Sequence, residues 1–516
     1  MLRPRLSHFL VLLCITFWSS RALAQVPATG GLADSIAVAA ATAAKDTANK
    51  ESPSKEASDN GSTDAPETAA AKDEQPATQP TSPLAIHVGD ADLLIGGFMD
   101  LTAIIRSTNT GNGIGTNFSN FPFTTTAAGA PNPQGNLSET RFSAQNSRLS
   151  LQATSKVGNA NLKGYVEADF LGNTAQNLEV TSHADTLRMR LFWAQYQNGK
   201  FEFLGGQTWS LLVPNRTGMG PMPGDLFYSQ DVDTNYQMGL TWTRAPEFRF
   251  VAHATDTFTA GIALEDPEQY VGGVTVLPTA FNAPQVNTGS GSNAIGSSSP
   301  TPNPAPDIIG TIAFDPKTGK THQHIEAAFV VSRFETFNPT VGTSGASYTK
   351  TGGGESVNAV LEPVPNFRLI ATNFFSNGGG RYIANTQIPD FIVNPDYSMS
   401  NVKAFSGIYG TEIQAGPKSL FYFYYSLANV TSNTTLDQNG KTVIGYGVTP
   451  SQAANHKIAE TTVGITETLF RDAKIGGMQL MFQYSYLKRT PFQVPAGTPA
   501  DAKLNMVYLN VRYLLP

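Results

Sequence analysis

Apolar and polar residues alternate with a period of two in many short segments of the chain, from about Leu93 to the C-terminus. In the last of these segments Val507, Leu509 and Val511 fall on one side of an extended chain, and Tyr508 and Asn510 fall on the other. Alternation over about ten residues is what a membrane-spanning β-strand requires, because one face meets lipid and the other meets a polar interior. The pattern therefore predicts membrane-spanning β-strands.

About sixteen such strands are predicted, and short polar turns alternate with long loops between them. The predicted strands lie near residues 93–107, 141–154, 161–171, 187–196, 200–209, 236–243, 248–255, 308–314, 323–337, 356–362, 367–376, 402–414, 420–427, 458–470, 478–488 and 503–515. The short turns include 197–200, 245–247, 315–320, 363–366, 416–418 and 471–477. The long loops lie near residues 108–140, 172–186, 210–235, 256–307, 338–355, 377–401, 428–456 and 489–502.

This spacing of connections predicts an all-β fold, a transmembrane antiparallel β-barrel with long extracellular loops and short periplasmic turns. A soluble β-sandwich or β-helix would also give short strands, but neither explains why every second connection is long. A closed sheet of about sixteen strands is too wide for side chains to fill, so its lumen should hold water. Both chain ends should then face the periplasm.

The N-terminus has the layout of a secretory signal peptide over residues 1–24. Arg3 and Arg5 precede an apolar run from Phe9 to Trp18, and Ala22-Leu23-Ala24 supplies small residues for cleavage. The alternative, a transmembrane anchor, needs about twenty apolar residues, and this run is roughly half as long. Export together with barrel strands predicts the outer membrane of a bacterium as the location.

Composition divides the rest of the chain in two. Residues 25–82 contain no Phe, Trp or Tyr and cannot bury a core, so they are predicted to be a low-complexity, disordered periplasmic tail. Residues 83–516 form the predicted barrel. Charged residues make up 14% of the chain, below the roughly 25% of ordinary soluble domains. Cys14, in the signal segment, is the only cysteine, so the mature chain has neither a disulfide nor a thiolate metal site.

Charged residues on the predicted inner face are the candidates for solute selection. On one strand Glu167 and Asp169 share the face of Lys163 and Tyr165, and on the next strand Arg188 and Arg190 share a face opposite Leu187, Met189, Leu191 and Trp193. Facing Arg and carboxylate pairs suit a narrow pore that needs a transverse field or a docking point for a carboxylate. They equally suit an ion-pair ladder that braces the wall. Arg148 and Arg249 are further candidates of the same kind.

The loop 210–235 is expected to fold into the barrel. It holds Arg216, Asp225 and the run Gly-Met-Gly-Pro-Met-Pro-Gly at residues 218–224, whose turn-forming residues allow a compact path. Its charges would narrow and polarise the opening. The alternative is a solvated external loop.

Three segments together resemble the DcaP-like family of trimeric bacterial outer-membrane porins. They are Gly205-Gly206-Gln207-Thr208-Trp209-Ser210, Arg188-Met-Arg190 and the strand from Tyr165 to Phe170. The resemblance runs from about Leu93 to the C-terminus. It implies a sixteen-stranded homotrimer in outer-membrane lipid that admits small anionic solutes such as dicarboxylates. The family's N-terminal coiled coil has no clear counterpart in residues 25–82.

Motifs of catalysis are missing from the sequence, and we expect no enzyme. There is no Gly-x-Ser-x-Gly elbow and no His-Glu-x-x-His, and His322 with His324 have no third metal ligand in evidence. We expect no cofactor, no metal and no nucleic-acid partner. Two functions stay open: a passive porin with anion or dicarboxylate preference, and a surface barrel or adhesin whose long loops bind a partner.

Overall fold

The computed structural model describes residues 82–516, apart from residues 112 and 282 and the segments 173–184, 233–236 and 290–300. The predicted signal peptide and all but the last residue of the predicted tail lie outside the described residues. The boundaries of these two segments therefore stay predictions.

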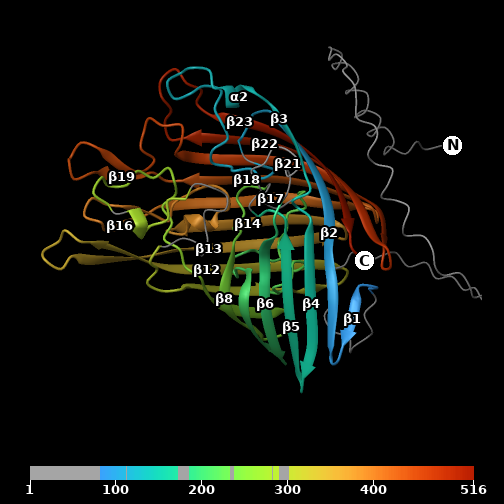
Figure 1. The fold of residues 1–516 in the computed structure, drawn as a ribbon. Coiled ribbons are helices and arrows are strands. Elements are labelled where there is room, and N and C mark those ends of the chain that lie inside the picture. Colours follow the sequence, from blue (N-terminus) through green and yellow to red (C-terminus); the bar gives the residue numbers. More distant parts are fainter. Residues whose placement is uncertain (1–81, 112, 173–184, 233–236, 282, 290–300) are drawn as a thin grey trace, which may run out of the picture. The chain divides into compact units, whose positions relative to one another are not determined.

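In the part of the chain that the structure describes, sixteen strands close into an antiparallel barrel (Figure 1). The ring closes where β23 (Ala502–Leu514) pairs with β2 (Ala91–Arg106), with Leu509 opposite Ala103. Leu509 and Val511 are exposed on the outer wall, whereas Tyr508 and Asn510 are buried inside. The predicted fold class is confirmed. The prediction of which side chains of the last strand share a face is confirmed too.

The other barrel strands follow in chain order, each paired with the next. The first half comprises β4 (Arg148–Val157), β5 (Ala160–Asp169), β6 (Arg188–Asn198), β7 (Phe201–Trp209), β8 (Arg244–His253), β9 (Phe258–Glu265) and β10 (Asp307–Phe314). The second half comprises β12 (Thr321–Asn338), β13 (Ala346–Val364), β14 (Phe367–Asn377), β17 (Lys403–Ala415), β18 (Ser419–Val430), β21 (Asn455–Asp472) and β22 (Gly476–Pro491). The alternation of short turns and long loops is as expected.

Two errors in the predicted strands cancel in the count. Of the predicted strand 236–243, the described residues 237–243 are not a strand but the end of an inward loop, and the missed strand β9 lies in the segment assigned to a loop. Pro246, read as a turn, lies inside β8, close to its loop end, opposite Gln207. Tyr236–Thr243 alternates like a strand, but Gln237, Met238, Leu240 and Thr241 are all buried, because the loop is enclosed on both sides.

Shorter elements extend the barrel at both ends. The predicted strand 141–154 is interrupted, so that β3 (Glu139–Ser143) and β4 pair with successive parts of β2. At the turn end, β1 (Ala85–Val88) pairs with β2 over Ala91–Leu94, and Ser82 Oγ donates to the Pro516 carbonyl oxygen at 2.9 Å. The two ends of the barrel sequence are thus fastened to each other.

The remaining elements lie in the loops. They are β11 (Lys317–Thr318), β15 (Phe391–Val393), β16 (Met399–Asn401), β19 (Asn433–Leu436), β20 (Val443–Tyr446), α2 (Pro133–Asn136) and two 3-10 turns at Ala283–Gln285 and Gly380–Tyr382. Among the described residues, none of the helices has the length and apolar composition to cross a membrane.

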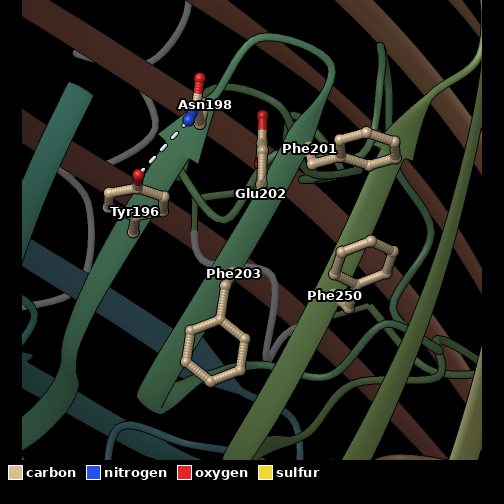
Figure 2. Close-up of a pocket in the computed structure, with 6 residues that line it drawn as sticks. All are labelled: Tyr196, Asn198, Phe201, Glu202, Phe203 and Phe250. Carbon is tan, nitrogen blue, oxygen red and sulfur yellow. Dashed lines mark hydrogen bonds between the residues drawn. The ribbon is translucent and has the colours of Figure 1, made fainter. Parts of the chain in front are cut away.

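Apolar side chains cover the outer wall of the barrel, where they would be exposed to water if the protein were not in a membrane. Figure 2 shows part of it on β6, β7 and β8, where Tyr196, Phe201, Phe203 and Phe250 line a shallow hollow. Phe201 is 57% exposed and stacks on Phe250 with ring centroids 5.8 Å apart. A soluble protein rarely exposes so much aromatic surface, whereas a lipid-facing wall requires it.

Candidate functional site

An ion-pair ladder lies on the inner face of β5 and β6. Arg188 binds Asp169 through two hydrogen bonds of 2.7 and 2.9 Å. Arg190 donates to Glu167 at 2.6 Å and to the same Asp169 at 2.9 Å. Asp169 is 0% exposed and Arg190 is 2% exposed. The structure therefore brings together four of the charged residues that alternation placed on the inner face.

A β-bulge at Arg190 in β6 changes which face of the wall the following side chains point to. Glu167 pairs with Leu191 and Ala168 pairs with Met189, so Arg190 is the extra residue. The period of two is broken there. Leu191 and Trp193 are buried inside, whereas Phe192 is 57% exposed outside. The expectation that Leu191 and Trp193 share the outer face with Met189 was wrong for this reason.

The Gly-Gly-Gln-Thr-Trp-Ser segment lies directly beside this bulge. Gly206 has φ +142°, and a Cβ there would lie 2.3 Å from the carbonyl oxygen of Phe192. Only glycine lets β7 approach the bulged strand so closely. Gln207 Nε2 then donates to the carbonyl oxygen of Arg190 at 2.8 Å.

Trp209, at the end of β7, lies between two guanidinium groups. Arg190 and Arg244 have their guanidinium carbons 5.7 and 5.2 Å from the centre of its ring. Both distances are within the range of cation–π attraction. Arg148, whose guanidinium carbon lies 5.3 Å from the ring of Phe98, also interacts electrostatically with Glu167. Four arginines thus gather around two carboxylates.

Arg244 is the member of this cluster that sequence reasoning missed. It is the first residue of β8, directly before Ala245-Pro246-Glu247, which the sequence indicated as a turn. Reading Pro246 as a break removed Arg244 from any strand. Arg244 pairs with Trp209, which belongs to the motif that carried the family resemblance. A search for the strand that pairs with this motif could have identified Arg244.

The described residues of loop L3 (residues 210–243), namely 210–232 and 237–243, fold into the barrel as expected. It is held by inward-facing residues of many strands: Val232 N donates to Gln483 of β22 at 2.9 Å, and Met238 N donates to Glu460 of β21 at 2.7 Å. Gln237 donates to Ser426 of β18 at 2.6 Å. L3 therefore reaches the wall formed by β18, β21 and β22, while its residues Val213 and Leu226 pack with Leu191 and Trp193 beside the ladder.

Arg216 is the charged anchor of L3. It donates to both carboxylate oxygens of Glu412 on β17, at 2.5 and 3.0 Å, and to the carbonyl oxygen of Tyr228. Asp225 is half-buried, and its carbonyl oxygen accepts from the Arg216 amide at 2.7 Å. The loop is thus closed on itself at the point where Arg216 reaches the wall.

Arg249 lies apart from the ladder. Its guanidinium pairs with Glu247 at 2.8 Å and donates to the carbonyl oxygen of Trp209. It is buried, so it supports the wall between β8 and L3. Of the predicted site residues, Arg216, Asp225 and Arg249 thus lie outside the group formed by Arg148, Glu167, Asp169, Arg188 and Arg190.

His324, considered above with His322 as a metal ligand, instead contacts two carboxylates that hold L3. His324 lies between Asp315 at 2.8 Å and Glu326 at 3.2 Å. Asp315 accepts from the Gly218 amide, and Glu326 accepts from Asn215, so both carboxylates hold the loop. Among the described residues, no group of three or more His, Cys, Asp or Glu side chains has a metal-binding arrangement.

A cavity of about 180 Å³ lies at the loop end of β7, β8 and β9. Its charged lining residues are Arg244, Glu265, Asp266, Glu268 and Arg381. Arg381 is already paired, since it binds Asp307 of β10 and donates to Asp390 at 3.1 Å. Burial raises the pKa of Asp390 to about 6, and Arg381 opposes that rise. Partial desolvation at the edge of the cavity also raises the pKa of Asp266, with Arg381 again opposing.

Comparisons with known proteins address the fold. No family model matches the chain, and no curated protein matches its sequence. Among solved structures, the crystal structure of the outer membrane channel DcaP of Acinetobacter baumannii is 16% identical, with a TM-score of 0.56 over 82% of this chain and 97% of that chain. An anion-selective porin from Comamonas acidovorans is 14% identical, with a TM-score of 0.43 over 82% and 99%. The chain therefore shares the barrel fold of DcaP.

Proposed function

We propose that the protein is a porin of the bacterial outer membrane, which lets small hydrophilic solutes diffuse passively through a water-filled lumen. The observation that carries the proposal is the closed sixteen-stranded barrel with an apolar outer wall and charged side chains inside. A barrel of this size is too wide for wall side chains to fill. The likeness to DcaP, described as an outer membrane channel, supports the same function.

A preference for anions follows from the charge balance of the ladder. Arg148, Arg188, Arg190 and Arg244 gather near Trp209, and the carboxylates beside them are Glu167 and Asp169. Within this cluster the arginines therefore outnumber the carboxylates by two. A fixed excess on a low-dielectric wall raises the local concentration of anions. Small carboxylates are the proposed solutes.

L3 is the proposed constriction. It crosses from β7 to the opposite wall and is fixed there by Arg216 and by the carboxylates of β12 and β21. Such anchors keep the loop in place while solutes pass. The charges of L3 and of the ladder would then face each other across the remaining opening.

We further propose that the protein forms a homotrimer in outer-membrane lipid, as the motif resemblance implies. The apolar outer wall is long enough to serve both lipid and neighbouring copies. Cross-linking of the protein in its native membrane should yield a three-chain species. A species of one chain alone would refute the trimer without affecting the channel.

Swelling of proteoliposomes tests the function. Vesicles that hold the protein should swell in isotonic small sugars and carboxylates, faster than empty vesicles do. A surface barrel that only binds a partner would leave the vesicles tight. Deleting residues 215–232 of L3 should speed the swelling if this loop is the constriction.

A further inference from the structure

Two opposite charges line the cavity at the loop end of β8 without pairing with each other. Among the residues that the structure describes, neither Arg244 nor Asp266 forms an ion pair or a side-chain hydrogen bond, and Arg244 Nη1 is buried without an acceptor. The other charged lining groups have partners: Glu268 accepts from Thr301, and Arg381 binds Asp307. Glu265 accepts from the Leu211 amide through one carboxylate oxygen, and its other oxygen is buried without a donor.

Arg244 is held in place although it lacks a carboxylate. Its guanidinium lies over Trp209, and that ring packs on Trp242 with centroids 4.0 Å apart. Arg190 and Arg188 are close enough to repel it. A fixed guanidinium with cationic neighbours favours any anionic group that enters the cavity.

Asp266 places a negative charge at the same cavity. It follows β9 directly, and its amide donates to the carbonyl oxygen of Pro246 at 3.0 Å, which fixes the backbone two residues from Arg244. The side chain is exposed and borders the same cavity. Glu268 lies on this side too. A solute with two negative ends would meet repulsion there, whereas a solute with a cationic end would not.

We propose that this cavity binds a small zwitterionic solute, whose carboxylate pairs with Arg244 and whose ammonium group pairs with Asp266. The site rests on the proposed function, because the solute reaches the cavity through the channel. The cavity volume of about 180 Å³ is about six times the volume that one molecule occupies in liquid water. This space suits an amino acid with a short carbon chain.

Blocking of the ionic current through the reconstituted full-length mature protein tests the proposal. The probes are β-alanine, its uncharged isomer lactamide, and propionate, which has the carboxylate alone. We expect β-alanine to reduce the current of single channels in a saturable manner, with little effect of lactamide and weaker block by propionate. Arg244→Gln and Asp266→Asn should each raise the half-blocking concentration of β-alanine tenfold or more.

Two further variants separate binding from folding. Arg244→Lys keeps the charge and should recover part of the block, and Arg333→Gln removes a charge on β12, away from the cavity, and should leave the block unchanged. Equal block by propionate and β-alanine, or block unaffected by Asp266→Asn, would overturn the zwitterion site and leave the channel intact. A protein that carries no current at all would refute the proposed function itself.

Discussion

Arg216 of L3 and Glu412 of β17 form a two-point ion pair inside the barrel, with hydrogen bonds of 2.5 and 3.0 Å. The residues are 196 positions apart in the sequence. The pair fixes the loop to a strand far from β7 and β8, which carry its ends. It is therefore one of the contacts that hold L3 across the barrel.

Replacing Glu412 by Gln should loosen L3. Breaking a buried ion pair at one partner leaves an uncompensated charge and costs about 3 kcal/mol. We expect a lower stability to denaturant and larger, noisier single-channel currents. Arg368→Gln is the matched control, because Arg368 reaches the same carboxylate only at 3.5 Å. Equal currents in Glu412→Gln and the native protein would show that this pair does not hold the constriction.

Variants of the ion-pair ladder can separate its two roles, which are to brace the barrel wall and to select anions. Arg190→Gln leaves the buried Glu167 without its guanidinium hydrogen bond, and only the electrostatic interaction with Arg148 remains. Both stability and anion preference should therefore fall. The double variant Glu167→Gln with Arg190→Gln removes both charges. It should recover most of the stability, since neutral groups of similar shape replace a buried pair.

Ion selectivity then decides between the two roles. The double variant keeps the net charge of the wall, because one positive and one negative group are removed together. If the excess of arginines sets selectivity, the double variant should select anions as the native protein does. Loss of selectivity in the double variant, measured as a reversal potential, would instead assign selection to the Arg190 guanidinium itself.

The bulge at Arg190 can be tested by single cysteines, since the only cysteine of the chain lies in the predicted signal peptide. A spin label at Phe192 should be accessible to oxygen dissolved in lipid, because this position faces outward. A label at Leu191 should not be, because that side chain is buried inside. The reverse pattern would mean that β6 alternates without a bulge.

Removal of residues 82–88 tests the fastening at the turn end. The deletion exposes the edge of β2 from Ala91 to Leu94 and removes the hydrogen bond from Ser82 to Pro516. We expect a loss on the order of 2 kcal/mol, seen as unfolding at a lower temperature on electrophoresis without prior boiling. A deletion of equal length at residues 60–66, in the predicted tail, is the control. Identical unfolding of both deletions would show that β1 adds no stability.

The sequence predicted the barrel because its strands face lipid on one side, and lipid imposes strict alternation. One error lies where that constraint ends: residues 237–243 alternate but lie in L3, where both faces are enclosed. The other is an omission, since Phe258–Glu265 does face lipid, with Ile262 and Leu264 exposed, but was assigned to the long loop that follows it. A local pattern cannot tell a strand that faces lipid from a segment that folds into the lumen.

The candidate site was predicted in part for the same reason. Glu167, Asp169, Arg188 and Arg190 follow from alternation along two strands, and the structure joins them in one ladder. The partners of Arg216 could not be predicted, since Glu412 is brought near only by the closure of the barrel. Arg244 was missed because Pro246 indicated a turn, although a proline is tolerated near the end of a strand.

The central claim is that the barrel conducts and favours anions. The most direct test is the zero-current potential of the protein in a planar bilayer under a gradient of potassium chloride. We predict an open channel whose potential has the sign for chloride preference and moves toward zero when Arg188 and Arg244 are both replaced by Gln. A potential of the opposite sign, or a membrane that stays closed, would contradict the account.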